Sequence, residues 1–321
     1  MRAIRMHGVG DPGVLRLDEV ARPEPGADDV LIEVAAAGVT FGDVMKRRGV
    51  FGRPDLPAGI GTEVAGTVVA AGAGSGPATG TRVAAWVDHG YAEYAVAAAD
   101  AVIPIPDEID EASAATVPVH GVTAYQTLTA AGRLHAGQTV LVHAAAGGVG
   151  TLAIQLARLL GAGTVIGTAG SAQRLEHVRA HGADLAVDYS TPGWSRHVLD
   201  ATDGRGADLV LESVGGRVAE ETFTCLAPFA TVVSFGAASG TPARPPSTTL
   251  MATNSSLVGY SLPGWLDRPD DVRAAAAQVM HLAAAKELQI PVAASYPLAA
   301  AGEAHAAIEN RTVTGNVVLI P

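Results

Sequence analysis

A glycine-rich turn between a buried strand and an amphipathic helix constrains the fold of this chain most. The turn Ala145-Ala146-Gly147-Gly148-Val149-Gly150 follows the apolar segment 139–143, and segment 149–160 repeats apolar residues at helical spacing. It is a G-x-G-x-x-G pattern with alanine for the first glycine. Small residues allow a close backbone approach, and the start of a helix offers free N–H groups and a positive dipole end to a pyrophosphate. We therefore expect this segment to bind a dinucleotide rather than to be an ordinary strand–helix turn.

Strands and helices alternate around this turn, which is typical of a doubly wound parallel sheet. The further segments expected to be strands are 164–168, 185–187, 208–211, 231–235 and 256–259, and 172–181 is expected to be a helix. Before residue 118, short apolar runs separated by Gly and Pro predict a β-rich, barrel-like unit. We therefore expect a dinucleotide-binding domain over 119–261. A second domain is expected to combine 1–118 with 262–321, which ends in a helix and a strand at 316–320.

Composition excludes several classes of protein. A chain of 321 residues with 48% hydrophobic and 17% charged residues fits two globular domains and not a disordered chain. The net charge is −11 and the longest basic run is Lys46-Arg47-Arg48, so we expect no nucleic-acid partner. The N-terminus has no apolar signal region and no uninterrupted run of 18 apolar residues occurs, so we expect no membrane association. The single cysteine, Cys225, excludes an internal disulfide and a cysteine-rich zinc lobe and favours the cytoplasm.

The residues after the turn indicate which dinucleotide binds. An NAD site usually carries an acid about 20 residues past the loop to bind the ribose 2′-hydroxyl. Counting from Gly150 leads to Gly170, which is followed by Ser171 and Arg174. A serine hydroxyl and a guanidinium suit a 2′-phosphate, so the sequence favours NADPH. The alternative is that Arg174 is only a solvated helix residue.

Metal and nucleophile motifs are weak. His177 and His181 are spaced i, i+4, but the H-E-x-x-H glutamate is missing and we expect a solvated helix face. Cys225 lies in an apolar stretch and is expected to be a small buried residue. No G-x-S-x-G elbow occurs, so acyl transfer has no support.

A family resemblance emerges from segments spread over the whole chain. Residues 57–66, Pro-Ala-Gly-Ile-Gly-Thr-Glu-Val-Ala-Gly, resemble the G-H-E-x-x-G segment of medium-chain dehydrogenases/reductases. Further similar segments follow in order at 90–94, 121–125, 144–150, 212–215, 234–236 and 314–319. Within that superfamily the chain is most similar to the zinc-independent quinone oxidoreductase (zeta-crystallin-like) branch. The resemblance implies an α/β protein with a Rossmann domain, a GroES-like catalytic domain and, through a sheet edge at 255–260, a homodimer.

Two substitutions within the resemblance argue against a metal. The zinc alcohol dehydrogenases carry cysteine where this chain has Thr40 and histidine where it has Thr62, and two hydroxyls do not replace a thiolate and an imidazole on zinc. In the cleft, the family's usual asparagine at Thr40 and frequent tyrosines at Met45 and Phe51 are also replaced. Thr40 and Asp43 remain as candidate catalytic residues, with a structural cap as the alternative role of Asp43.

The resemblance also implies the cofactor contacts and the reaction. At the pyrophosphate and the nicotinamide ribose, the resemblance implies Thr123 and the backbone of Ala146, Gly147, Gly148 and Val149. At the 2′-phosphate it implies Gly170, Ser171, Arg174 and Tyr189. Toward the nicotinamide it implies Ser213, Phe235 and Gly236, with Asn316 where many relatives have lysine. The expected activity is hydride transfer from NADPH to a quinone-type acceptor. Reduction of an activated C=C bond in an enal, enone or enoyl thioester is the alternative, and a non-catalytic NADPH-binding protein is a further one.

Overall fold

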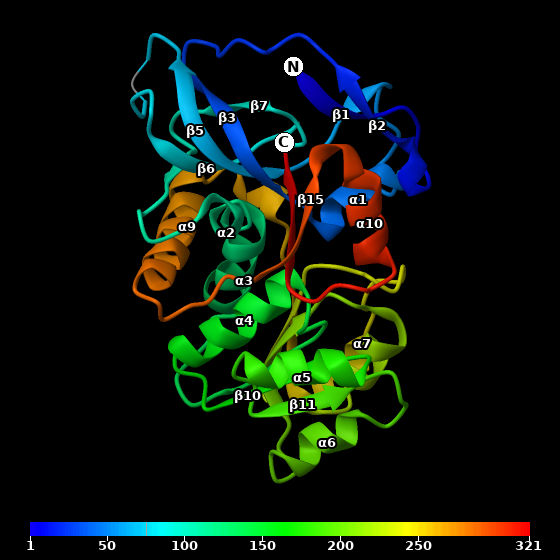
Figure 1. Ribbon diagram of the computed structural model, residues 1–321. Coiled ribbons are helices and arrows are strands. Elements are labelled where there is room, and N and C mark those ends of the chain that lie inside the picture. Colours follow the sequence, from blue (N-terminus) through cyan, green and yellow to red (C-terminus); the bar gives the residue numbers. More distant parts are fainter. Residues whose placement is uncertain (75) are drawn as a thin grey trace. The chain divides into compact units, whose positions relative to one another are not determined.

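The structure is a computed structural model, in which residues 1–74 and 76–321 are described (Figure 1). The chain divides into two compact units, one made of 1–122 with 266–321 and one made of 123–265. The class is mixed α/β, as predicted. The chain passes from the first unit to the second within one helical segment, in which π-helical turns at Val117–Gly121 and Thr127–Ala131 flank α3 (Val122–Gln126). No helix in these described ranges is long and apolar enough to span a membrane.

The first unit is built on two β-sheets. Its seven-stranded sheet has the order β15-β16-β3-β5-β6-β8, with β7 also paired to β3. These strands are β3 (Asp29–Gly38), β5 (Glu63–Ala71), β6 (Arg82–Trp86), β7 (Tyr94–Ala98), β8 (Ile103–Pro104), β15 (Val292–Pro297) and β16 (Asn316–Ile320). The smaller sheet has the order β2-β1-β4, made of β1 (Arg2–Met6), β2 (Leu15–Glu19) and β4 (Ala58–Gly59). Gly66 lets β5 approach β3 closely, because a Cβ there would lie 1.9 Å from the Glu33 carbonyl oxygen.

The described residues of the first unit form four α-helices in addition to short 3₁₀ turns. They are α1 (Phe41–Arg47), α2 (Glu111–Ala114), α9 (Pro269–Ala284) and α10 (Ala301–Glu309), and the turns are η1 (Pro12–Val14) and η5 (Leu298–Ala300). The core of this unit is mostly Val, Ile, Ala and Leu, and it includes the fully buried Tyr91. Few aromatic residues are needed because valine and isoleucine side chains pack closely on a pleated sheet.

The second unit contains a six-stranded, all-parallel sheet. Its order is β11-β10-β9-β12-β13-β14, which is the doubly wound arrangement in which the chain starts in the middle and winds both ways. The strands are β9 (Thr139–Val142), β10 (Thr164–Ala169), β11 (Leu185–Asp188), β12 (Ala207–Glu212), β13 (Leu226–Ser234) and β14 (Ser256–Gly259). The helices are α4 (Gly148–Leu159), α5 (Ala172–Ala180), α6 (Ser195–Asp200), α7 (Gly216–Thr222) and α8 (Ser247–Thr253), followed by the 3₁₀ turn η4 (Leu262–Trp265).

Strand β13 begins earlier than the predicted 231–235. Its register with β12 shifts after the Ala207–Leu226 pair, and Phe229 has a positive φ of 63° within this irregular stretch. Pro228 cannot donate a ladder hydrogen bond, and a proline within an apolar run argues against a strand when only the sequence is known.

The predictions for His177, His181 and Cys225 can be compared with the structure. The helix face of His177 and His181 is only partly solvated: both residues are half-buried, Nε2 of His177 lies 2.9 Å from the Thr151 hydroxyl, and the two imidazole rings lie 4.0 Å apart. Burial, and then the charges of His181 and Arg174, lower the pKa of His177 to about 4. Cys225 is buried as predicted, and burial raises the pKa of its thiol to about 12.

Candidate functional site

The glycine-rich turn lies at the carboxyl end of β9, where the strand order reverses direction. Ligands bind at this position in doubly wound sheets. The turn is fixed by hydrogen bonds from the Ala145 N–H to the Thr168 carbonyl at 2.9 Å and from the Gly147 N–H to the Ala144 carbonyl at 2.9 Å. Gly147 is the N-cap of α4, and no side chain caps this helix. The first N–H groups of α4 therefore stay available to an anion.

Gly150 brings the helix against the turn. A Cβ at Gly150 would lie 2.5 Å from the Ala144 carbonyl oxygen and 2.6 Å from the Ala145 Cα, and both of these are backbone atoms. Gly147, by contrast, is exposed, and a Cβ there would meet only the Ala144 oxygen at 3.3 Å. Gly147 therefore leaves space in front of the start of α4, and Gly150 allows α4 to pack closely against the turn.

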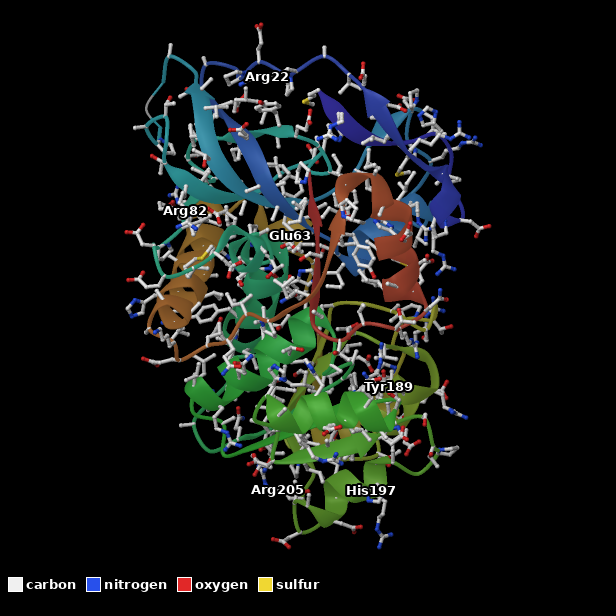
Figure 2. The ribbon with its side chains drawn as sticks, viewed as in Figure 1. Arg22, Glu63, Arg82, Tyr189, His197 and Arg205 are labelled. Carbon is white, nitrogen blue, oxygen red and sulfur yellow. The ribbon has the colours of Figure 1, made fainter. Side chains whose placement is uncertain are left out.

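The residues expected around the 2′-phosphate gather at the carboxyl ends of β10 and β11. Gly170 lies against Tyr189, because a Cβ at Gly170 would be 3.4 Å from Cε2 of the ring, and Figure 2 labels Tyr189 in this unit. Ser171 is the exposed N-cap of α5, and its hydroxyl makes no capping hydrogen bond. Arg174 follows within the first turn of α5 and is half-buried. The arrangement leaves no carboxylate at the Gly170 position that would repel a phosphate.

Ser213, Phe235 and Gly236 are also brought together by the structure. The Phe235 N–H donates to the Glu212 carbonyl at 2.9 Å, and a Cβ at Gly236 would lie 2.9 Å from the Ser213 carbonyl oxygen. The buried carboxylate of Glu212 holds the turn after β12 by accepting from the N–H groups of Val214 and Gly215 at 2.5 and 2.8 Å. Sequence reasoning missed this role of Glu212, although it opens the 212–215 segment.

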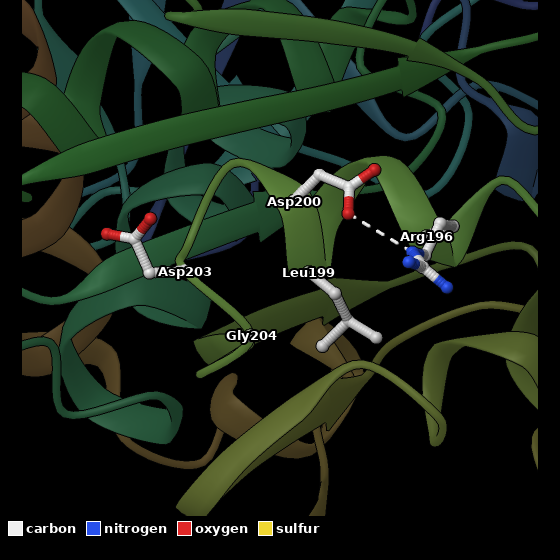
Figure 3. A pocket seen from close by; sticks show the side chains of 5 residues that line it. All are labelled: Arg196, Leu199, Asp200, Asp203 and Gly204. Carbon is white, nitrogen blue, oxygen red and sulfur yellow. Dashed lines mark hydrogen bonds and ion pairs between the residues drawn. The ribbon is translucent and has the colours of Figure 1, made fainter.

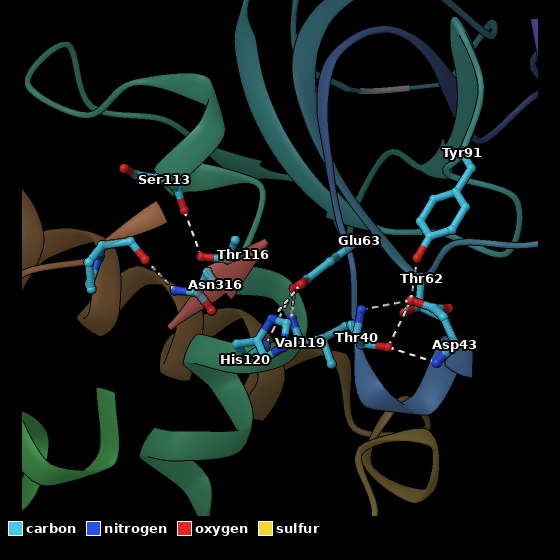
Figure 4. Close-up of polar contacts among 11 residues, drawn as sticks. Thr40, Asp43, Thr62, Glu63, Tyr91, Ser113, Thr116, Val119, His120 and Asn316 are labelled. Carbon is cyan, nitrogen blue, oxygen red and sulfur yellow. Dashed lines mark hydrogen bonds and ion pairs between the residues drawn. The ribbon is translucent and has the colours of Figure 1, made fainter. Parts of the chain in front are cut away.

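Thr123 and Asn316 are not part of these groups. Thr123 is buried in α3, where its carbonyl accepts from the Thr127 hydroxyl at 2.7 Å. Asn316 opens β16 in the first unit, whereas the other predicted cofactor residues belong to the second unit. Its amide donates to the Pro291 carbonyl at 3.2 Å (Figure 4), and its Oδ1 is buried with no hydrogen-bond partner among the described residues.

Thr40 and Asp43 form a capping box at the start of α1. The Asp43 N–H donates to the Thr40 hydroxyl at 2.9 Å, and the Thr40 N–H and hydroxyl donate to Oδ2 of Asp43 at 3.1 and 2.8 Å. The half-buried Thr62 adds a hydroxyl 3.4 Å from the same oxygen (Figure 4). Burial raises the pKa of Asp43, and the hydrogen bonds from Thr40 oppose part of that rise. The cap role of Asp43 is therefore present in the structure.

A second layer of buried polar side chains contacts Asp43 from other elements. The Tyr91 hydroxyl lies 3.3 Å from Oδ2 of Asp43 and 3.1 Å from Nε2 of His305 on α10. Burial and then the Arg47 charge lower the pKa of His305 to about 3, and burial followed by Asp43 raises the pKa of Tyr91 well above its usual value. Arg47 and Glu309 join α1 to α10 through an ion pair of 2.5 Å. No local sequence signal connects these residues, which lie far apart in the chain.

Glu63 and His120 form a separate buried pair in the first unit (Figure 4). Oε1 of Glu63 lies 2.6 Å from Nδ1 of His120, and Oε2 accepts from the Val119 N–H at 2.8 Å. Burial lowers the pKa of His120, but the Glu63 carboxylate outweighs it and the net shift is upward. Gly38 makes room for this carboxylate, since a Cβ there would lie 2.2 Å from Oε1 of Glu63. The pair anchors the π-helical turn that leads into Thr123.

Two other kinds of site were considered, a metal site and the surface hollow shown in Figure 3. Within residues 1–74 and 76–321, no group of three or more His, Cys, Asp or Glu side chains is arranged to hold a metal. The hollow is lined by Arg196, Leu199, Asp200, Asp203 and Gly204. Arg196 and Asp200 pair with each other on the exposed face of α6 at 3.1 Å, so the hollow presents no unpaired charge from these two residues.

Comparisons with known proteins agree with this description. Residues 26–107 match the family model "Alcohol dehydrogenase GroES-like domain", and residues 148–281 match "Zinc-binding dehydrogenase". The chain is 35% identical to a quinone oxidoreductase of Pseudomonas aeruginosa over 325 residues, covering 100% of this chain and 99% of the relative. It is 32% identical to the Homo sapiens quinone oxidoreductase over 327 residues, with coverages of 100% and 98%.

Solved structures show the same fold over the whole chain. Escherichia coli quinone oxidoreductase complexed with NADPH has a TM-score of 0.93 and 31% identity, and the match covers 100% of both chains. Mycobacterial Rv1454c complexed with NADPH has a TM-score of 0.93 and 34% identity, again over 100% of both chains. The predicted pairing of a Rossmann domain with a GroES-like domain is thereby confirmed. The chain belongs to the quinone oxidoreductase branch of the medium-chain dehydrogenase/reductase superfamily.

Proposed function

We propose that this chain, an NADPH-dependent oxidoreductase of the quinone oxidoreductase branch, reduces a quinone-type acceptor without zinc. The observation that carries the proposal is the uncapped start of α4 at the switch point of the sheet, together with Gly170 at the position where an NAD site usually carries an acid. Both features suit a dinucleotide with a 2′-phosphate. Relatives of this branch named quinone oxidoreductases, and neighbours complexed with NADPH, support the same activity.

The residues of the second unit fit the cofactor, and we propose 119–261 as its binding domain. The α4 N–H groups would hold the pyrophosphate, Ser171 and Arg174 the 2′-phosphate, and the Ser213 and Gly236 turns the nicotinamide half. When bound, NADPH supplies the hydride. The protein supplies orientation and an environment that keeps water away from the transfer.

We propose the remaining residues, 1–118 with 262–321, as the catalytic domain. Thr40 and Asp43 would be its polar anchors for the acceptor, with the Thr40 hydroxyl facing the reduced oxygen or carbon. Exposed apolar side chains follow Thr40 in the sequence: Phe41 is 36%, Val50 60% and Phe51 72% exposed. An exposed apolar group of this kind suits a planar, apolar acceptor.

A second activity, reduction of an activated C=C bond, is favoured by one observation. The Asp43 carboxyl is buried and hydrogen-bonded to Thr40 and Tyr91, and a C=C acceptor requires a positioned proton donor. A panel of quinones, enones and primary alcohols, followed by nicotinamide absorbance, tests the proposal. Quinone turnover with NADPH supports it. Binding of NADPH with no turnover of any acceptor would instead identify a non-catalytic NADPH-binding protein.

We also propose a cytoplasmic location. The buried Cys225 thiol, with its raised pKa, is protected from oxidation and has no partner cysteine in the sequence. A free thiol and an NADPH-dependent activity both suit a reducing compartment.

Activity is expected to survive prolonged chelation. The hydroxyls of Thr40 and Thr62, at the positions of two zinc ligands in alcohol dehydrogenases, both donate to Oδ2 of Asp43. Neutral hydroxyls are poor zinc ligands compared with thiolate and imidazole. Metal analysis of the purified protein should show no stoichiometric zinc. One zinc ion per chain, with activity lost on its removal, would contradict the proposal.

The protein is expected to be a homodimer. Strand β14 ends the strand order of the parallel sheet, and Leu257 on it is 36% exposed. An unprotected edge of this kind favours pairing with a second copy across a two-fold axis. Light scattering at micromolar concentration should give the dimer mass, and Leu257→Lys should shift it toward the monomer. A monomer mass for the wild type would rule the assembly out.

A further inference from the structure

The Glu63–His120 pair combines a sealed carboxylate with an imidazole that reaches water. The Glu63 side chain has no exposed surface, whereas the His120 side chain keeps 10% of its surface exposed. Both oxygens of Glu63 face N–H groups, since Oε1 lies 2.6 Å from Nδ1 of His120 and Oε2 accepts from the Val119 N–H at 2.8 Å. The carboxylate is thus satisfied in its ionised form and orients the imidazole beside it.

The contact with Glu63 determines which nitrogen of His120 exchanges protons. An ionised carboxylate only accepts hydrogen bonds, so Nδ1 of His120 carries a proton and donates it to Oε1. Nε2 makes no hydrogen bond with residues 1–74 or 76–321, and it is not buried away from water as the unpartnered Nδ1 of His305 is. Nε2 is therefore the position at which His120 loses a proton and takes one up from solvent.

The backbone holds both members of the pair in place. Gly38 on β3 lies opposite Glu63 on β5 in the sheet register, and a Cβ at Gly38 would overlap Oε1 of Glu63. Glycine at this position therefore leaves the space that the carboxylate occupies. His120 lies in the π-helical turn Val117–Gly121, and the Val119 N–H of that turn binds the other carboxylate oxygen.

The pair adjoins the proposed acceptor anchors along the same two strands. Thr62 directly precedes Glu63, and Thr40 comes two residues after the end of β3, where β3 pairs with Glu63. The hydroxyls of Thr62 and Thr40 lie 3.4 and 2.8 Å from the same oxygen of Asp43 (Figure 4). The charge of Asp43 raises the pKa of His120, so these two side chains are close enough to interact.

The charged groups around His120 favour its protonated form. Burial lowers the pKa of His120, but the Glu63 carboxylate on β5 and then the Asp43 charge on α1 outweigh burial, and the net shift is upward. From α9, the side chain that meets the turn at Gly121 is the apolar Val279. The protonated imidazole balances the charge of Glu63, so the pair holds a proton at a buried site without leaving an isolated carboxylate there.

We propose that His120 is a catalytic acid, which donates its Nε2 proton to the carbonyl oxygen of the quinone as that oxygen becomes anionic, and that Glu63 positions it. This inference rests on the proposed function, because it assumes a quinone-type acceptor held beside Thr40. It adds a proton donor to that function, and it defines the acceptor by a conjugated carbonyl oxygen.

The step balances in protons and electrons. The quinone takes a hydride supplied by NADPH and becomes a hydroquinone monoanion. Its anionic oxygen forms an O–H bond with the Nε2 proton of His120 as the N–H bond breaks, and Nδ1 stays bound to Glu63. Nε2 then takes a proton from solvent. The sum is one quinone, one NADPH and one proton converted into one hydroquinone and one NADP⁺.

His120→Gln removes the acid and keeps a polar side chain. We expect kcat/KM to fall about tenfold or more with dimethylbenzoquinone and less than about threefold with dichlorobenzoquinone. Chlorine substituents make the hydroquinone more acidic, so its anion needs a proton donor less, and methyl substituents have the opposite effect. A general loss of structure would slow both quinones equally. The NADPH dissociation constant and thermal unfolding should stay close to the wild-type values.

The pH profile tests the protonation state of His120. Its protonated form is the active one, so wild-type kcat/KM with dimethylbenzoquinone should be highest at low pH and fall as the pH rises through the raised pKa of His120. Glu63→Gln removes the charge that holds the proton, so this fall should move to lower pH. A purely structural anchor would change the rate without moving the inflection. His120→Gln should abolish the inflection.

His281→Gln is the matched control, since it makes the same substitution at an exposed residue of α9 in the same unit. It should leave both rates and the pH profile unchanged. Equal losses with the two quinones in His120→Gln, no loss with either, or an unmoved inflection in Glu63→Gln would overturn the acid role and leave the proposed function standing. A wild type that reduces no quinone overturns both.

Discussion

Replacing Arg174 by alanine is expected to raise the dissociation constant of NADPH roughly tenfold to a hundredfold. Arg174 lies in the first turn of α5, three residues after the N-cap Ser171, and Gly170 before it lies against Tyr189. A charge-assisted hydrogen bond contributes about 1.5–3 kcal/mol, which corresponds to that range. NADH lacks the phosphate, so its affinity should barely change. Titration of both cofactors into wild type and variant, followed by fluorescence or calorimetry, measures the effect.

Arg179 provides the control for Arg174. It lies in the last turn of the same helix and is exposed, so Arg179→Ala removes an equal charge away from the predicted phosphate position. We expect the NADPH affinity of Arg179→Ala to stay close to that of wild type. If Arg174→Ala weakens both cofactors equally, or if wild type binds NADH as tightly as NADPH, the 2′-phosphate assignment is wrong.

Replacing Gly150 by alanine is expected to weaken both the fold and cofactor binding. The new methyl group would lie 2.5 Å from the Ala144 carbonyl oxygen and 2.6 Å from the Ala145 Cα. These backbone atoms cannot move to another rotamer as a side chain can, so α4 must shift away from the glycine-rich turn. Overpacking of this kind costs about 1–3 kcal/mol of unfolding free energy. NADPH affinity should fall roughly tenfold or more, because the helix start no longer faces the pyrophosphate.

Gly147→Ala separates these two effects. Its methyl group would meet only the Ala144 oxygen, at 3.3 Å, and would point into open space at the helix start. Thermal unfolding should therefore change little, while NADPH binding weakens because the added methyl group obstructs the close approach of the phosphate. Unfolding at the wild-type temperature for Gly150→Ala would show that the contact relaxes and that the argument fails.

The parallel sheet of the second unit was predictable because its strands are buried on both sides. Continuous apolar runs such as β9 (Thr139–Val142) and β12 (Ala207–Glu212), separated by helices with apolar stripes, carry a strong periodic signal. The first part of β13 was missed, since Pro228 argues against a strand and the positive φ of Phe229 has no signal in the sequence. The π-helical turns beside α3 have no composition that distinguishes them from an α-helix.

The candidate site was predictable where function depends on backbone shape. The turn at 145–150 and the missing acid at Gly170 are local features of the sequence. The Tyr91–His305 and Glu63–His120 contacts were not predictable, because they join residues separated by 214 and 57 positions. Only the folded sheet brings such residues together. The same holds for Glu212, whose side chain is recognised as a turn anchor only once the Val214 and Gly215 N–H groups are placed.

The position of β16 has a consequence for how the chain is made. This strand, Asn316–Ile320, lies between β15 and β3 and pairs with Ala37 and Gly38 on the latter. The second unit, by contrast, occupies one uninterrupted stretch, 123–265, which comes before β16 in the sequence. During translation the second unit can complete its sheet while this end of β3 still lacks its β16 partner. An open strand edge invites pairing with other chains. The growing polypeptide therefore carries an open edge in its first unit until the residues of β16 have been synthesised and can pair.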